Sequence, residues 1–136
     1  WKAVSGADAY DPDVAARGYL ATPGMKVSVM GADGMPVVAG GAHETDPGVW
    51  LGWMVGSMAG WGSHWRAITK TNRWLMGQLF AGGARRIYVS TITTREQACR
   101  WYEKALGMTR EGVHRRAGAQ GQDIVFYSRI AEDGQP

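Results

Sequence analysis

Hydrophobic and polar residues alternate most regularly between Arg86 and Ile92. Ile87, Val89 and Thr91 share one face of this segment, and the segment is rich in β-branched residues. A period of two residues with β-branched side chains is typical of a strand that packs against a core. The pattern therefore predicts a buried strand here.

The segment after this strand is predicted to be an amphipathic helix. Thr93 with Glu96, and Thr94 with Gln97, both have the spacing of a capping box, which favours a helix start at this point. Gly107 follows the apolar pattern where a left-handed helix end is expected. The predicted apolar face consists of Ala98, Trp101, Tyr102, Ala105 and Leu106.

The first half of the chain predicts a hairpin and a further strand. Met25–Met30 and Met35–Ala42 are apolar segments that flank an Asp33-Gly34 turn, which is a hairpin signature. The polar segment His43–Gly48 is interpreted as a loop. Val49–Val55 is apolar on both faces, which predicts a central strand.

A glycine-rich segment separates that strand from a second long helix. Gly56–Ser63 is predicted to be a loop, and His64–Phe80 a helix with Ser63 as its N-cap. The uncharged run over residues 47–63 is too short and too rich in glycine to favour a membrane span. Trp65, Ile68, Leu75, Met76 and Leu79 form the predicted apolar stripe of this helix. The remaining predictions are a short helix over Asp11–Leu20, with Asp11 as cap, and strands at Arg110–Arg116 and Asp123–Ile130, followed by a frayed tail.

Charge is distributed unevenly over the 136 residues, a length that suits one domain. Residues 65–116 contain eleven Lys or Arg against three Glu, which gives +8, whereas the remainder carries −5. Arg66, Lys70 and Arg73 form a basic stripe on the long helix. A basic half of this kind suits the phosphates of a nucleotide cofactor or of nucleic acid, and a solvated helix face explains it equally well.

The number of cysteines limits which cellular compartment and which metal or disulfide chemistry the sequence suggests. Cys99 is the only cysteine, so no disulfide forms within this chain, which favours a reducing compartment such as the cytoplasm. The sequence contains no cluster of Cys and His residues, so it gives no reason to expect a metal site.

The C-terminal half resembles the GNAT acyltransferase superfamily. In this family a strand is typically followed by the sequence motifs Asn-x-x-Ala, Tyr-Glu-Lys, Gly-Phe and then Glu-Gly. Met108 replaces the usual Phe, and Arg95 replaces the usual Asn. The resemblance implies a single α/β (α+β) domain over residues 1–136, with a mixed, mostly antiparallel sheet flanked by helices. The family's opening strand is then either absent or precedes Trp1. The matching residues are Ala98, Tyr102, Glu103, Lys104, Gly107, Glu111 and Gly112.

This resemblance implies a reaction and a site. The implied activity is transfer of an acetyl group from acetyl-CoA to an amine, with Tyr102 as the general acid. Glu44 or His43 is the base candidate, by position alone. The family's pyrophosphate motif, Gln/Arg-x-x-Gly-x-Gly/Ala, is broken, because Ser57 stands where Gln or Arg is usual. The residues expected to hold the coenzyme are Val55, Gly60, Gly62, Ser63 and Arg66.

A second resemblance is to the short GNAT-like proteins of short-tailed phages. Trp53–Ser57 matches their Trp-x-Val-x-Ser strand, and they too have a basic helix without the pyrophosphate motif. This resemblance implies a non-catalytic virion or assembly protein, whose partners are other virion proteins and whose location is the host cytoplasm or the virion. Both hypotheses remain open, as do an oligomeric state and nucleic-acid binding through the basic stripe.

Overall fold

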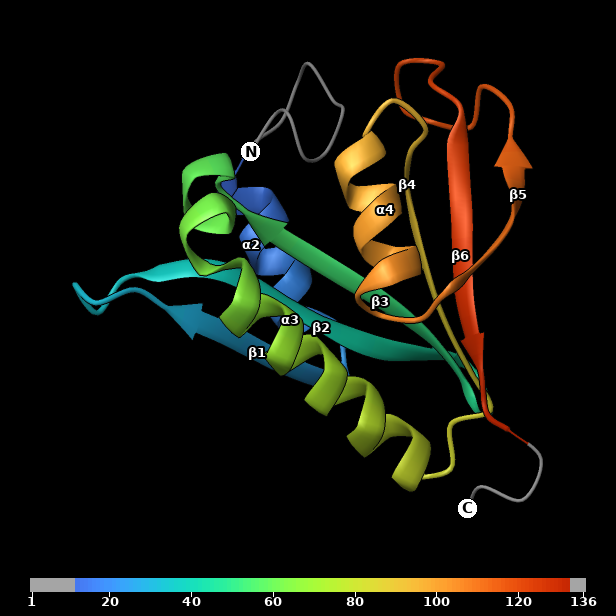
Figure 1. The fold of residues 1–136 in the computed structure, drawn as a ribbon, viewed down its shortest axis with the longest axis horizontal. Helices are drawn as coiled ribbons and strands as arrows, with labels where there is room; N and C mark the ends of the chain where they lie inside the picture. The colour runs from blue at the N-terminus through green and yellow to red at the C-terminus, as the bar shows by residue number, and fades with distance from the viewer. Residues whose placement is uncertain (1–11, 133–136) are drawn as a thin grey trace.

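The computed structural model describes residues 12–132 as a six-stranded mixed sheet with helices on both faces (Figure 1). The strand order is β1-β2-β3-β4-β6-β5, and every neighbouring pair is antiparallel except β3 and β4. This architecture confirms the predicted fold class. The strands are β1 (Met25–Met30), β2 (Pro36–Asp46), β3 (Val49–Gly56), β4 (Arg86–Ile92), β5 (Thr109–His114) and β6 (Ile124–Ile130), and the helices are α2 (Pro12–Ala21), α3 (Met58–Ala81) and α4 (Glu96–Lys104).

Strand β2 is longer than the sequence predicts. The hairpin of β1 and β2 is confirmed, but the loop predicted for His43–Gly48 is wrong, because β2 continues to Asp46 and pairs with β3. Gly41 lies in the part of β2 that pairs with β1. A Cβ at that position would lie 2.1 Å from the Met25 carbonyl oxygen and 3.1 Å from the Trp53 ring. Glycine therefore lets the neighbouring strand and ring approach the backbone closely.

Strands β3 and β4 diverge along their length. They pair in parallel at three positions only, which join Val49 to Arg86, Trp50 to Ile87, and Leu51 to Tyr88. Beyond this last pair β3 continues to Gly56 and β4 to Ile92 without pairing to each other. The two central strands thus separate toward their carboxyl ends, and the gap between them defines the site.

Helix α3 starts earlier than predicted, so the glycine-rich loop and the Ser63 cap are both wrong. Ser57 is the N-cap, and its Oγ accepts a hydrogen bond from the Gly60 amide at 2.9 Å. Helical structure therefore includes Gly62 and Ser63. The non-helical backbone of His64 (φ −125°, ψ 16°) kinks the helix at the point where the sequence suggested that it begins.

Helix α4 begins at Glu96, with Arg95 at the N-cap position and no side-chain cap bond. The two capping boxes predicted at Thr93 and Thr94 are therefore wrong. The predicted end is confirmed: Gly107 has φ +64°, and the Met108 amide bonds the Tyr102 carbonyl oxygen at 3.0 Å. A left-handed residue of this kind closes the helix by satisfying its last carbonyl groups.

Helices α3 and α4 cover one face of the sheet, and α2 covers the other, where Tyr19 stacks on Trp53 with ring centroids 4.5 Å apart (Figure 1). Trp65 was predicted in the apolar stripe of α3 but is 45% exposed. Among the described residues no helix has the length and apolar character needed to cross a bilayer. The predicted cap at Asp11, any opening strand and most of the predicted frayed tail lie outside the described residues. The main core consists of Ala42, Leu75, Met76, Leu79, Phe80, Ala84, Ile87, Leu106, Met108, Val125 and Tyr127.

Candidate active site

A cavity of about 260 Å³, here called the central cavity, lies in the gap between β3 and β4. Val89, which packs in the α3–α4 core, and Thr91 line it from one face of the sheet. Trp53, which stacks on α2, and Ser90 line it from the other face. Since successive strand residues point to opposite faces, the gap reaches through the sheet.

A second hollow of about 490 Å³, here called the helix groove, lies between the N-terminal ends of α3 and α4. Ser57 and Met58 line it from α3, and Arg95 and Arg100 line it from the α4 side. It shares walls with the central cavity, so the two hollows are adjacent. The shared residues are Met54, Thr91, Arg95, Trp101 and Tyr102.

The helix groove suits an anionic group. The amides in the first turn of an α-helix have no acceptors within the helix. In α3 the Ser57 hydroxyl accepts the hydrogen bond of one of them, the Gly60 amide. Met58, the first residue of α3, lines the groove, so the groove lies at the positive end of the helix dipole. Arg95 and Arg100 line the groove together with Glu96, so two guanidinium groups face one carboxylate and the charge of the wall is net positive.

Tyr102 stands where the two hollows meet. It lines both, and no hydrogen bond of its hydroxyl to another described residue is seen. Burial raises the pKa of Tyr102 to about 12, and the positive charge of Arg95 opposes that rise. The hydroxyl is therefore protonated at neutral pH.

Trp101 of α4 contacts α3 next to Tyr102. Its indole Nε1–H donates to Thr69 Oγ1 at 2.8 Å, and its ring meets the Trp61 ring edge-on at 4.7 Å between centroids. Further along, Arg73 Nε donates to the Ala105 carbonyl oxygen at 2.8 Å. These contacts hold α3 and α4 together beside the groove.

Neither base candidate from the sequence lines these hollows. The Glu44 carboxylate is exposed and accepts a hydrogen bond from the Gly48 amide at 2.7 Å, so it closes the β2–β3 turn. His43 has a buried Nδ1 with no partner among the described residues. Because Ala42 faces α3 and α4, strand alternation places His43 on the opposite face. The described residues that line the central cavity include no His, Asp or Glu.

The residues predicted to hold the coenzyme are also mostly elsewhere. Val55 is buried, and Gly60, Gly62 and Ser63 belong to α3, with Gly60 capped by Ser57. Arg66 lies over the Trp65 ring, 4.9 Å from its centroid. None of these five lines the helix groove.

The sequence interpretation missed the basic wall of the groove. It treated Arg95 as the loss of an Asn, and it interpreted Arg100 only as a helix-surface partner of Glu96. It also missed Ser57 as a cap, although Ser directly after an apolar strand is a helix-start signal. Within residues 12–132 no three His, Cys, Asp or Glu side chains gather where a metal ion would bind.

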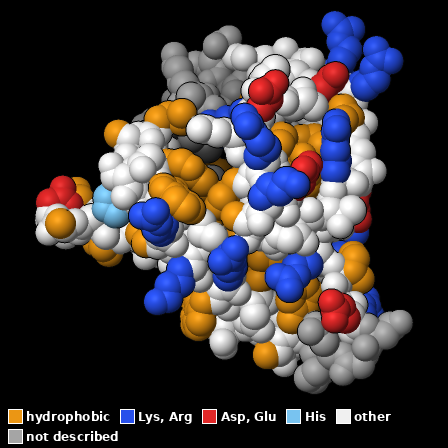
Figure 2. Space-filling model, viewed as in Figure 1, with side chains coloured by type: hydrophobic (Ala, Val, Ile, Leu, Met, Phe, Trp, Pro, Cys, Tyr) orange, Lys and Arg blue, Asp and Glu red, His pale blue; other side chains and the backbone are white. Residues whose placement is uncertain are grey.

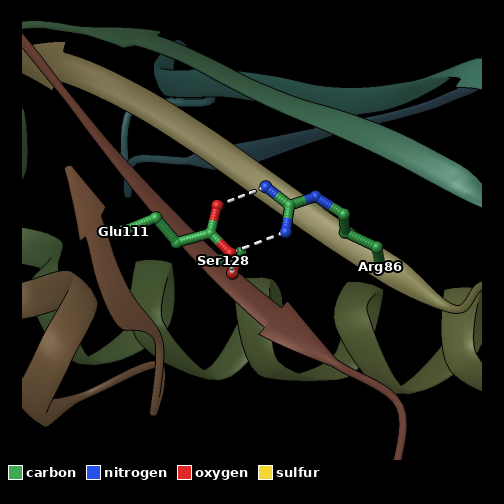
Figure 3. A network of polar contacts seen from close by, with 3 residues as sticks. All are labelled: Arg86, Glu111 and Ser128. Atoms are coloured by element: carbon green, nitrogen blue, oxygen red, sulfur yellow. Dashed lines mark hydrogen bonds and ion pairs between the residues drawn. The ribbon is translucent and has the colours of Figure 1, made fainter. Parts of the chain in front are cut away.

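A polar network braces the sheet on the face away from α3 (Figure 3). Arg86 of β4 pairs with both carboxylate oxygens of Glu111 of β5, and Ser128 Oγ of β6 donates to Glu111 Oε1 at 2.5 Å. The Arg86 guanidinium, with help from the Ser128 hydroxyl, lowers the pKa of Glu111 to about 2. The network joins three strands and keeps β5 in place.

The fold is that of solved GNAT acetyltransferases. The chain is similar to a GCN5-related N-acetyltransferase from Kribbella flavida, at 21% identity and a TM-score of 0.70, over 90% of this chain and 81% of that one. It is also similar to a GNAT phosphinothricin acetyltransferase from Sinorhizobium meliloti solved with AcCoA, at 17% identity and a TM-score of 0.71, over 90% and 70% of the two chains.

A third similar structure is a spermidine N-acetyltransferase variant from Vibrio cholerae, at 13% identity and a TM-score of 0.65, over 87% of this chain and 72% of that one. No protein-family model matches the sequence, and no curated protein matches it. At these identities the likeness establishes the fold.

Proposed function

We propose that this protein transfers an acetyl group from acetyl-CoA to an amine. The observation that carries the proposal is the position of Tyr102, a protonated hydroxyl where the basic helix groove meets the central cavity. The GNAT fold supports it, and so does the AcCoA bound to one similar structure. Glu44 is not proposed as the base, because its carboxylate closes a turn.

The two hollows fit an elongated ligand with an anionic end. Phosphate groups would meet Arg95, Arg100 and the α3 N-terminus, while a narrow uncharged arm would enter the central cavity. The cavity wall suits such an arm, because Leu75, Met76 and Val89 form part of it. Of the residues predicted from the sequence, Tyr102 is retained, and the phosphate contacts pass to Ser57, Arg95 and Arg100.

Bound acetyl-CoA supplies an activated thioester carbonyl. The amine nitrogen attacks the carbonyl carbon, a C–N bond forms and the C–S bond breaks. Tyr102 gives its proton to the departing sulfur, which leaves as a thiol. The nitrogen loses one proton to water, and Tyr102 is then reprotonated by solvent. Water serves as acceptor because the described lining of the central cavity has no carboxylate or imidazole.

Calorimetric titration with acetyl-CoA, followed by a thiol-release assay over a panel of polyamines, amino acids and lysine peptides, tests the proposal. We expect micromolar binding by the wild type and by Tyr102→Phe, and turnover with one amine class by the wild type alone. Absence of binding at millimolar acetyl-CoA would refute it.

A non-catalytic role on the same scaffold, as in a virion or assembly protein, is the second candidate. The edge-on packing of Trp61 and Trp101 in the groove wall favours it, because two large rings there obstruct close approach of a phosphate. Recovery of the chain from purified particles, together with absent coenzyme binding, would favour this candidate over the enzyme.

A further inference from the structure

The outer face of α3 carries positive charge only. Arg66, Lys70 and Arg73 are exposed on it, and the helix contains no Asp or Glu. Figure 2 shows Lys and Arg side chains gathered on the face of the molecule that α3 and α4 form. None of these three residues lines the central cavity or the helix groove. The charge is therefore separate from the proposed coenzyme site.

Two tryptophans flank this charge. Trp65 is 45% exposed and Trp74 is 53% exposed, in a chain whose Trp50, Trp53, Trp61 and Trp101 are at least partly buried. An exposed Trp leaves a large apolar surface in water, which is unfavourable. Its large π face stacks well on planar partners. The Arg66 guanidinium already lies over the Trp65 ring, 4.9 Å from its centroid. Among the described residues no ring or guanidinium is seen against Trp74, so its exposed face can stack on a base.

We propose that this α3 surface, formed by Trp65, Arg66, Lys70, Arg73 and Trp74, binds single-stranded nucleic acid. Such sites combine a basic track for the phosphates with aromatic rings on which bases stack. The sequence pI of about 9.3 also falls in the range of nucleic-acid-binding domains.

The spacing of the cations suits a phosphate backbone. At 1.5 Å rise per residue, the three cations lie at intervals of roughly 6 Å and 4.5 Å along the helix. A row of three cations over roughly 10 Å of helix can contact phosphates that follow one another along a single strand. Arg73 is steadied by its bond to the Ala105 carbonyl oxygen. Arg73 and Arg66 are therefore held in place, Arg66 by the Trp65 ring.

Two other occupants fit less well. A second copy docked through the same surface would bring six cations together, which is repulsive. A lipid surface requires an apolar helix face to insert, but the apolar residues Ile68, Leu75 and Leu79 of α3 are buried in the protein. Single-stranded nucleic acid uses both the charge and the exposed rings.

Fluorescence anisotropy of a labelled 12-nucleotide oligothymidine, titrated with the full chain at 50–200 mM salt, tests the proposal. With three phosphate contacts the slope of log K against log salt is expected near about −2, at about −0.7 per contact. Arg66→Gln/Lys70→Gln should flatten the slope to about −0.7. Lys26→Gln/Arg115→Gln removes two exposed cations elsewhere and should leave the slope unchanged. Trp74→Ala should weaken binding roughly 5- to 100-fold.

Several outcomes would overturn the inference. They are no binding at 50 mM salt, equal losses in the two charge-pair variants, or no effect of Trp74→Ala. Binding to polyglutamate as tight as to oligothymidine would point instead to an acidic protein partner. Binding only to phosphatidylglycerol vesicles would assign the surface to lipid. Sedimentation equilibrium of wild type and Arg66→Gln/Lys70→Gln would expose a dimer built on α3. Circular dichroism confirms that each variant is folded.

Discussion

The indole Nε1–H of Trp101 on α4 donates a hydrogen bond to the Thr69 hydroxyl on α3, at 2.8 Å. The same hydroxyl donates to the Trp65 carbonyl oxygen at 2.7 Å, and Thr69 is 6% exposed. The Thr69 hydroxyl therefore connects the two helices that border the helix groove. Both of its hydrogen bonds lie in the mostly buried interface between α3 and α4.

Thr69→Val should lower the free energy of unfolding by about 1–3 kcal/mol, because it leaves the Trp101 Nε1–H without its acceptor in a part-buried place. Thr71→Val on the same helix is the matched control and should change stability by less than about 0.5 kcal/mol. Urea denaturation measures both. A double-mutant cycle with Trp101→Phe should show coupling, and additive losses would mean that the bond contributes little.

Tyr102→Phe should lower kcat roughly 100-fold while acetyl-CoA affinity stays unchanged, because only the proton donor is lost. Since the pKa of Tyr102 is about 12, its proton is present below that pH and lost above it. The pH profile of wild-type kcat should thus show no loss of activity from ionisation of Tyr102 below about pH 11. Tyr88→Phe is the control and should keep full activity. An unchanged kcat in Tyr102→Phe would remove the general-acid role.

The sequence predicted most of the elements but few of the contacts at the site. Strand β4 and the end of α4 at Gly107 follow from local patterns, since β-branched alternation and a left-handed glycine act within a few residues. The start of α3 was missed because four glycines between residues 52 and 62 suggested a loop. In the structure Ser57 caps the helix, and that cap outweighs the low helix propensity of glycine.

The groove was missed for a different reason. Arg95 and Met58 are far apart in the sequence, and they line one hollow only because β3 and β4 run parallel with a helix after each. Nothing local to Arg95 predicts this. The same holds for Glu44, whose base role was a guess from position and whose carboxylate bonds an amide four residues away.

The ion pair of Arg86 and Glu111 should make stability depend on acidity. The pKa of Glu111 is lowered from 4.5 to about 2, so its stabilising effect is fully present above about pH 5 and is lost as pH falls toward 2. Both side chains are about one-third exposed (32% and 36%), so after solvent screening we expect a loss of about 1 kcal/mol. Glu111→Gln should flatten the stability profile between pH 5 and 2. Glu96→Gln, an exposed Glu on α4, should leave that profile as in the wild type in urea titrations.

Arg95→Gln should weaken acetyl-CoA binding by roughly 10- to 100-fold, because a charge-assisted contact in the helix groove is lost. It should also raise the pKa of Tyr102 further, since Arg95 is the cation that lowers it. Arg110→Gln removes an exposed charge outside the groove and is the control. Calorimetry of the three proteins measures the difference, and equal affinities would place the phosphates elsewhere.

Gly41 and Gly62 should respond in opposite ways to substitution by Ala. At Gly41 the new Cβ would meet the Met25 carbonyl oxygen at 2.1 Å, and that backbone cannot move without breaking β1–β2 pairing. Gly41→Ala should therefore cost about 2–3 kcal/mol. At Gly62 nothing lies within 4 Å, and the residue is helical, so Gly62→Ala should stabilise by about 0.5–1 kcal/mol. Thermal melts of both variants test the pair. Weaker acetyl-CoA binding by Gly62→Ala would show that this glycine takes part in coenzyme binding after all.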